Sequence, residues 1–172
     1  MNVKALHKLG YGLYLVASKL GERLNAQTAN SVFQITSEPP TVAVSINKNN
    51  LTHQFIHESG VFAAVVLRKD TPLSFIGRFG FKSGRDTDKL EGVDYSIGET
   101  GAPLVEENTI AYLEAEVIKE VDVGSHTIFI GKLVNADITS DEPAMTYEYY
   151  HQVKRGTTPK AAPSYIEEKR RK

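Results

Sequence analysis

The chain has 172 residues, and none of them is a cysteine. This absence excludes disulfides, thiolate metal sites, iron–sulfur clusters and a cysteine nucleophile. Redox chemistry would therefore need a bound organic cofactor, or a metal held by histidines and carboxylates.

The sequence also lacks a long hydrophobic run and a strong net charge. No segment reaches the roughly 20 apolar residues of a membrane span. The short apolar stretch at 9–17 contains two glycines and has no cleavage site after it, unlike a signal peptide. With 20 basic and 21 acidic residues the net charge is -1, which disfavours a nucleic-acid binder. We expect a soluble, cytoplasmic protein that binds neither nucleic acid nor a membrane.

Length and composition point to one domain over residues 1–172, since no repeat or low-complexity linker interrupts the chain. Residues 156–172 are interpreted as a C-terminal extension. It ends in the basic stretch EEKRRK, which we expect to be a solvated tail.

Most of the chain has the pattern of β-strands. The expected strands are 13–18, 31–36, 41–46, 61–67, 109–123 and 126–135. The run 61–67 (VFAAVVL) is almost wholly apolar, which is typical of a strand buried on both faces. Few helices are expected: 52–59 with Thr52 as N-cap and Gly60 at its end, 72–79, and 1–9. About six strands and few helices favour a closed or nearly closed antiparallel barrel.

The run 109–123 has the longest regular alternation. Its odd positions are mostly apolar, with Lys119 out of step, and its even positions include Glu114, Glu116 and Glu120. A period of two predicts one buried face and one wet face, with these glutamates in water.

Two histidines four residues apart, His53 and His57, would share one face of a helix. The zinc-protease pattern needs a glutamate directly after the first histidine, and Gln54 occupies that position. We interpret the two histidines as a surface pair and predict no metal site.

Three polar segments have both an ordinary and a functional interpretation. The segment 25–31 (NAQTANS) is either a polar loop or a set of backbone N–H donors for a planar ligand such as a flavin. The segment 45–53 (SINKNNLTH) is either a capped strand-to-helix connection or a phosphate site at a helix start. The segment 83–90 (SGRDTDKL) is either a solvated charge cluster or a source of cations for that phosphate. Neither a Walker loop nor a Gly-x-Gly-x-x-Gly motif is present.

Two further features lie nearer the C-terminus. His126 follows a predicted turn, where it is either a surface residue or part of a pocket mouth. Tyr147, Tyr149 and Tyr150 cluster in the segment 145–156, where aromatic rings favour packing onto the barrel or onto a second subunit.

Taken in order, these segments resemble the flavin reductase-like family. The resemblance runs from about residue 5 to 166 and includes NAQTANS, TVAVSINKNNLTH, VFAAVVL, SGRDTDKLEG, HTIFIGKLVNA and TYEYYHQVKRGTTPKAAPSY. The last motif resembles flavoredoxins, the flavin domains of high-molecular-weight rubredoxins and the FMN ferric reductases. The resemblance implies a mainly β fold: an antiparallel, Greek-key-like FMN-binding split β-barrel with a few short helices.

The resemblance also implies roles for particular residues. The isoalloxazine ring of FMN would be lined by Asn25, Ala26, Gln27 and Thr28. The ribityl chain and phosphate would be held by Ser45, Asn47 and Thr52, with Lys89 and Arg85 balancing the phosphate charge. His126 would stand beside the flavin on the nicotinamide side as the catalytic candidate, and no metal is implied.

The implied activity is electron transfer from NAD(P)H through FMN to free flavin, ferric iron or a rubredoxin-like protein. A fused rubredoxin domain would need four cysteines, so such an acceptor would be a separate molecule. The alternatives are a flavoredoxin-type carrier with little NAD(P)H activity and a non-redox module for another phosphorylated ligand. The family implies a homodimer, in which Pro159–Tyr165 would reach the partner's pocket.

Overall fold

The computed structural model describes residues 1–165, so the predicted basic tail lies outside the described residues. In chain order the elements are a short 3-10 helix (Val3–Lys8), β1 (Tyr14–Leu20), β2 (Arg23–Ala29), β3 (Val32–Ser37), β4 (Pro40–Asn47), α1 (Leu51–Ser59), β5 (Val61–Leu67), α2 (Leu73–Phe81), β6 (Tyr95–Ile97), β7 (Pro103–Val105), β8 (Thr109–Asp122), β9 (His126–Ile138) and α3 (Tyr147–Gln152). None of the helices among these residues is long and apolar enough to cross a membrane.

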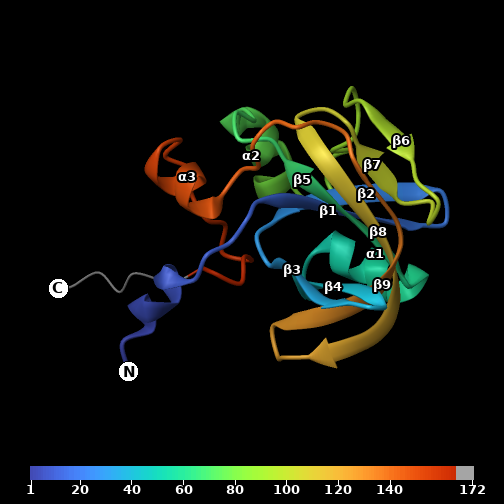
Figure 1. The fold of residues 1–172 in the computed structure, drawn as a ribbon, viewed down its shortest axis with the longest axis horizontal. Coiled ribbons are helices and arrows are strands. Elements are labelled where there is room, and N and C mark those ends of the chain that lie inside the picture. Colours follow the sequence, from blue (N-terminus) through green and yellow to red (C-terminus); the bar gives the residue numbers. More distant parts are fainter. Residues whose placement is uncertain (166–172) are drawn as a thin grey trace.

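Seven of the strands form one antiparallel sheet in the order β2-β1-β5-β8-β9-β4-β3, and β6 pairs with β7 separately (Figure 1). Ala29 of β2 and Val44 of β4 lie near opposite ends of this order, yet they share one buried cluster with Phe62 and Phe129. The sheet must therefore curl until its two ends enclose a common core. This confirms the mainly β, antiparallel split barrel expected from the sequence.

A second core covers the outside of β1 and β5. It joins Val65 of β5 to Phe75 and Phe79 of α2, Leu104 of β7 and Tyr150 of α3. Strand β5 is thus buried on both faces, as its apolar run predicts. Helix α1 contributes Ile56 to the barrel interior and lies between β4 and strands β1 and β2 (Figure 1).

Tight turns set the two main hairpins. Gly21, with φ +59°, joins β1 to β2, and Gly124, with φ +86°, joins β8 to β9. A side chain is strained at such φ values, so glycine allows these short connections. The predicted turn at 122–125 and its two flanking strands are confirmed.

The segment NAQTANS is not a loop, because its first five residues belong to β2. They pair with β1 through Ala17 opposite Ala26 and Ser18 opposite Asn25. Asn and Gln have low strand propensity, but tertiary pairing overrides it here. Together with the unpredicted β6 and β7, this raises the number of strands in the described residues from about six to nine.

The predicted wet face of β8 is wrong at Glu114, whose exposed fraction is 0%. Register shifts between Glu114 and Ala115, and between Val117 and Lys119, break the regular alternation with β9. An unpaired residue in a strand changes which face the following side chains occupy. Ile118 is the residue skipped at the second shift, next to the Lys119 that is out of step in the sequence.

Helix α1 begins one residue earlier than predicted, at Leu51, and its N-cap is Asn50 rather than Thr52. The Asn50 side chain makes no capping hydrogen bond. Gly60 ends the helix in the left-handed conformation (φ +71°), as expected. Helix α2 corresponds to the predicted helix at 72–79 and continues to Phe81.

Candidate functional site

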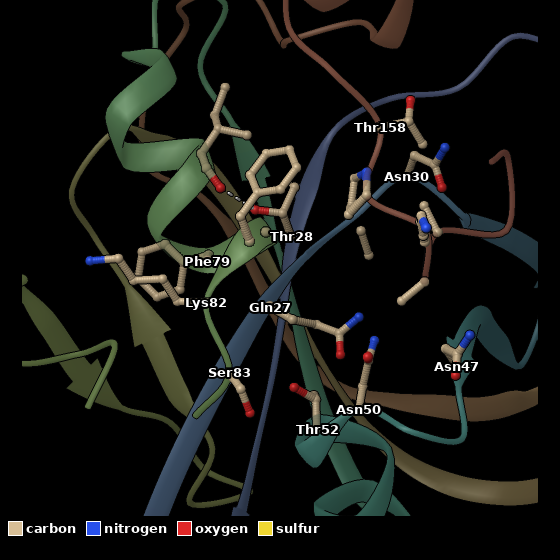
Figure 2. A pocket seen from close by; sticks show the side chains of 18 of the residues that line it. Gln27, Thr28, Asn30, Asn47, Asn50, Thr52, Phe79, Lys82, Ser83 and Thr158 are labelled. Carbon is tan, nitrogen blue, oxygen red and sulfur yellow. Dashed lines mark hydrogen bonds between the residues drawn. The ribbon is translucent and has the colours of Figure 1, made fainter. Parts of the chain in front are cut away.

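A pocket of about 630 Å³ opens where several chain segments converge. Its walls come from β2, the end of β4, the N-terminus of α1, the C-terminal half of α2, the loop 82–89 and the segment 157–165 (Figure 2). The volume falls within the usual range of small-molecule sites. The site therefore combines residues that are more than 130 positions apart in the sequence.

The charged residues that line this pocket are all basic among the described residues. Among the described residues, Lys82, Arg85, Lys89 and Lys160 line it and no acidic residue does. Figure 2 shows the Lys82 ammonium turned away from the other labelled side chains, so it contributes least to the interior. Such a lining favours an anionic ligand.

Lys89 is the most deeply placed of these cations. Its exposed fraction is 4%, and its Nζ donates a 3.4 Å hydrogen bond to the Phe79 carbonyl near the end of α2. Burial lowers the pKa of Lys89 to about 8. Among the described residues no carboxylate forms an ion pair with it. A buried ammonium without an anion is costly, and an anionic ligand in the pocket would relieve that cost.

The N-terminus of α1 lies in the same pocket. The first N–H groups of a helix have no intrahelical acceptor, and here the N-cap side chain supplies none. Thr52 Oγ1 accepts a 2.6 Å hydrogen bond from Asn25 Nδ2, which leaves the threonine hydroxyl proton free for a ligand. A phosphate is the anion that a helix N-terminus with adjacent cations suits best.

Arg85 connects the loop 82–89 to the turn before α1. Its Nη1 donates a 2.9 Å hydrogen bond to the Asn49 carbonyl, and both residues line the pocket. The ordinary interpretation of SGRDTDKL, a solvated charge cluster, therefore fails for Lys89, which is buried. The sequence alone gave no sign of that burial.

Of the four residues expected along the flavin ring, three line the pocket and one does not. Asn25, Gln27 and Thr28 line the pocket, whereas Ala26 is fully buried in the second core. Thr28 donates its hydroxyl proton to the Ile76 carbonyl (Figure 2). Gln27 Oε1 is buried and has no hydrogen-bond partner among the described residues. Such an acceptor is rare, and a donor on a bound ligand would satisfy it.

Ser45 and Asn47, at the end of β4, also line the pocket. Asn47 Oδ1 accepts a hydrogen bond from the Asn49 backbone N–H and shapes the turn before α1. The structure thus brings together every predicted binding residue except Ala26 and His126.

His126 does not line the pocket among the described residues. Its Nε2 lies 3.2 Å from the Ala161 carbonyl, and its Nδ1 lies 2.9 Å from Ser125 Oγ. Ala161 itself lines the pocket, so His126 stands behind the wall that the C-terminal segment forms.

That segment was expected to reach a partner's pocket, and in the structure it lines the pocket of its own chain. Sequence reasoning singled out the tyrosines of the preceding segment 145–156 but missed Lys160 and the small residues around it. The residues of α2 that line the pocket, Ile76, Phe79 and Phe81, were missed as well. Their hydrophobic pattern resembles that of any core helix.

The histidine pair of α1 lies outside the pocket, with His57 exposed and His53 half-buried. His57 Nδ1 is 2.8 Å from Glu120 Oε2, and His53 Nε2 is 2.8 Å from Thr127 Oγ1. Burial and the neighbouring His57 lower the pKa of His53. Within residues 1–165 no three His, Asp or Glu side chains converge as a metal site would require.

The backbone of Gly84 lies close to the Asn25 side chain, and this contact gives a first prediction. A Cβ at Gly84 would overlap the Asn25 side-chain oxygen and lie 3.0 Å from Leu51 Cδ2. We expect Gly84→Ala to push the loop 82–89 outward with Arg85 and to weaken ligand binding roughly tenfold. Gly77→Ala is the control, because a Cβ there makes only a 3.7 Å contact with Phe81. Equal affinities of the two variants in a flavin titration would contradict this role of Gly84.

A nearly closed antiparallel barrel with a pocket lined by basic residues at a helix N-terminus suits a phosphorylated small molecule. Comparison with known proteins identifies the family. Residues 6–158 match the family described as flavin reductase like domain, and the chain belongs to that family.

Two relatives match nearly the whole chain. A protein of Moorella thermoacetica named high molecular weight rubredoxin is 56% identical over 96% of this chain and 72% of its own. A protein of Archaeoglobus fulgidus named ferric-chelate reductase (NAD(P)H) is 47% identical over 98% of this chain and 100% of its own. Among solved structures, the NADH:FAD oxidoreductase of Streptomyces globisporus C-1027 superposes with a TM-score of 0.76 and 26% identity, covering 84% of this chain and 85% of the other. The chain is thus a flavin reductase-type oxidoreductase.

Proposed function

We propose that the pocket binds FMN and that the protein transfers electrons from NAD(P)H through FMN to a small or protein acceptor. The observation that carries the proposal is that Lys89, Arg85 and the N-terminus of α1 line the same pocket, which no acidic residue among those described lines. Two cations and free N–H groups match the charge of a phosphate monoester, which is close to -2. Bound FMN would supply hydride acceptance and stepwise electron release.

The described residues fit FMN in three respects. Thr52, Ser45 and Asn47 offer hydroxyl and amide groups beside the phosphate end, as a ribityl chain requires. Gln27 Oε1 needs a donor, and the edge of an isoalloxazine ring carries one N–H. The Arg85 guanidinium bonds the Asn49 carbonyl just before α1, which would place a cation beside a terminal phosphate at the helix start.

The names of the relatives support the donor and the acceptor. The Archaeoglobus protein, whose whole length this chain matches, is named for NAD(P)H and ferric chelates. The Moorella protein is named a rubredoxin, which favours a rubredoxin-like acceptor. That name also favours the second candidate, a flavoredoxin-type carrier that reacts slowly with NAD(P)H. Phe33 and Ile35 are exposed on the edge strand β3 and support a homodimer, which sedimentation of the FMN-loaded protein would reveal.

The direct test mixes FMN-loaded protein anaerobically with NADH or NADPH and follows the flavin absorbance by stopped flow. Rapid bleaching with either nucleotide is expected and would identify the donor. If only dithionite bleaches the flavin, the carrier function holds instead. A protein that purifies without flavin and binds neither FMN nor FAD would refute both functions, and tighter binding of FAD would refute the choice of cofactor.

His126 provides a further prediction. We expect His126→Ala to slow flavin reduction or acceptor use by roughly tenfold or more while FMN remains bound, because the ring stands beside the pocket wall and not at the phosphate end. The measurement is the stopped-flow reduction rate at saturating nucleotide, followed by reoxidation with ferric citrate. His57→Ala, at an exposed position of α1 outside the pocket, is the control. Unchanged rates in both half-reactions would remove His126 from the reaction.

A further inference from the structure

The pocket wall formed by Thr157–Tyr165 is not part of the barrel. The family match ends at residue 158, so nearly all of this wall lies beyond the matched region. It has no regular secondary structure, and few of its hydrogen bonds are internal. Its place over the pocket must therefore come from side chains of other elements.

One hydroxyl group joins the two ends of this wall. Tyr147 OH lies 2.5 Å from Thr158 Oγ1 and 3.0 Å from Ser164 Oγ. Ser164 Oγ also accepts a 2.6 Å hydrogen bond from Asn30 Nδ2 at the end of β2. Both Asn30 and Thr158 line the pocket and are labelled in Figure 2. The wall is thereby tied to the barrel through Tyr147 and Asn30.

The Tyr147 ring is itself held firmly. Its backbone N–H donates to the Tyr11 carbonyl at 2.9 Å, and its ring packs edge-on against Tyr11 at 6.0 Å and His151 at 4.3 Å between centroids. The hydroxyl therefore sits at a fixed point from which it can bond both Thr158 and Ser164. Three further hydrogen bonds hold one wall residue each: Tyr150 OH to the Thr157 carbonyl at 2.8 Å, His126 Nε2 to the Ala161 carbonyl at 3.2 Å, and His151 Nε2 to Thr158 Oγ1 at 3.2 Å.

We propose that Tyr147 is a positioning residue that keeps the segment Thr157–Tyr165 closed over the pocket, so that FMN stays bound through turnover as a prosthetic group. This inference rests on the proposed FMN site. Lys160 in the wall adds a positive charge to the lining, so an anionic cofactor and a closed wall stabilise each other. Release of the cofactor then requires the Tyr147 hydrogen bonds to break.

The test compares Tyr147→Phe with Tyr149→Phe. The first variant loses only the hydroxyl and keeps the ring. Tyr149 lies on the same helix, and its hydroxyl makes no hydrogen bond to the described residues, while its ring contacts Lys69 Nζ. FMN release is measured as the recovery of free-flavin fluorescence after dilution. Tyr147→Phe is expected to release FMN roughly tenfold faster than the wild type, and Tyr149→Phe at the wild-type rate. Equal release rates for all three proteins would overturn the proposal.

Trypsin provides a second readout that needs no flavin, because Lys160 is exposed within the wall. In the apoprotein, Tyr147→Phe should be cut after Lys160 several times faster than the wild type, and FMN should slow this cleavage in the wild type. Ser164→Ala removes the other end of the same hydrogen bond, and we expect the same direction of change. If the wild type binds no FMN, the proposed function fails, while cleavage of the apoprotein still tests the attachment. Cleavage unchanged in both variants would refute it.

Discussion

Replacing Lys89 with methionine is expected to weaken FMN binding by roughly 10- to 100-fold at pH 7, which is the usual effect of losing a charge-assisted hydrogen bond. The methionine keeps most of the buried volume and removes a buried ammonium that pairs with no carboxylate among the described residues. Binding is measured by flavin fluorescence quenching. Lys82→Met is the control, since the Lys82 ammonium points away from the pocket (Figure 2) and its loss should change the affinity little.

The same lysine should make FMN binding depend on pH. Burial lowers the pKa of Lys89 to about 8 in the empty pocket, so the side chain is charged below pH 8 and becomes neutral above it. Only the charged form attracts the phosphate, which is itself almost fully ionised above about pH 7. The affinity should therefore be constant between about pH 7 and pH 8 and fall by up to about tenfold per pH unit above pH 8. In Lys89→Met this fall should disappear. If the variant retains FMN as tightly as the wild type, Lys89 does not contact the phosphate.

The parts of the fold that the sequence predicted are those with local signals. The apolar run of β5 and the glycine turn before β9 depend on neighbouring residues, and both are confirmed. Strand β2 was missed because Asn25 and Gln27 are polar for a reason that lies outside the strand: one of its faces lines a pocket. Local propensity cannot reveal a face that is polar because it binds a ligand.

The candidate site was likewise predicted only where its signals are local in the sequence. The polar segments around Asn25, Asn47 and Arg85 were recognised individually, and the family resemblance supplied their order. The wall at Lys160 and the apolar side at Phe79 depend on contacts between residues far apart in the chain. No spacing rule in a single sequence encodes such contacts. The burial of Lys89 likewise depends on a contact between separate segments, because its Nζ bonds the Phe79 carbonyl of α2, ten residues away in the sequence.

Glu114 is the clearest case in which a regular pattern misled. Alternation placed it in water, but it accepts hydrogen bonds from the Glu99 and Thr100 backbone N–H groups, the Thr100 hydroxyl and Asn135 Nδ2, at 2.7 to 3.1 Å. Gly98 lies so close that a Cβ there would overlap the carboxylate. The carboxylate thus holds the turn between β6 and β7 against β8 and β9.

We expect Glu114→Ala to lower the free energy of unfolding by about 3 kcal/mol, because it leaves several buried donors without an acceptor. Urea unfolding at pH 7 measures this loss. Glu116→Ala, two residues along β8 and exposed, should change stability by less than about 0.5 kcal/mol. Neither Glu114 nor its hydrogen-bond partners line the pocket, so the folded fraction of Glu114→Ala should bind FMN normally. Equal stabilities of the two variants would show that Glu114 contributes nothing.

Lowering the pH should remove the stability that the ionised Glu114 carboxylate contributes. Burial acts to raise the pKa of the Glu114 carboxyl, but the hydrogen bonds from Thr100, Asn135 and Glu99 outweigh it and hold the pKa below its ordinary value of 4.5. Because the folded state favours the charged form, this stability is present above pH 4.5 and is lost as the pH falls through the lower folded value. Glu114→Gln cannot ionise, so the wild type should be more stable than this variant at pH 7 and should lose most of that advantage near pH 3. A difference that stays constant between these two pH values would mean that the geometry of the turn, and not the charge of Glu114, holds β6 and β7 in place.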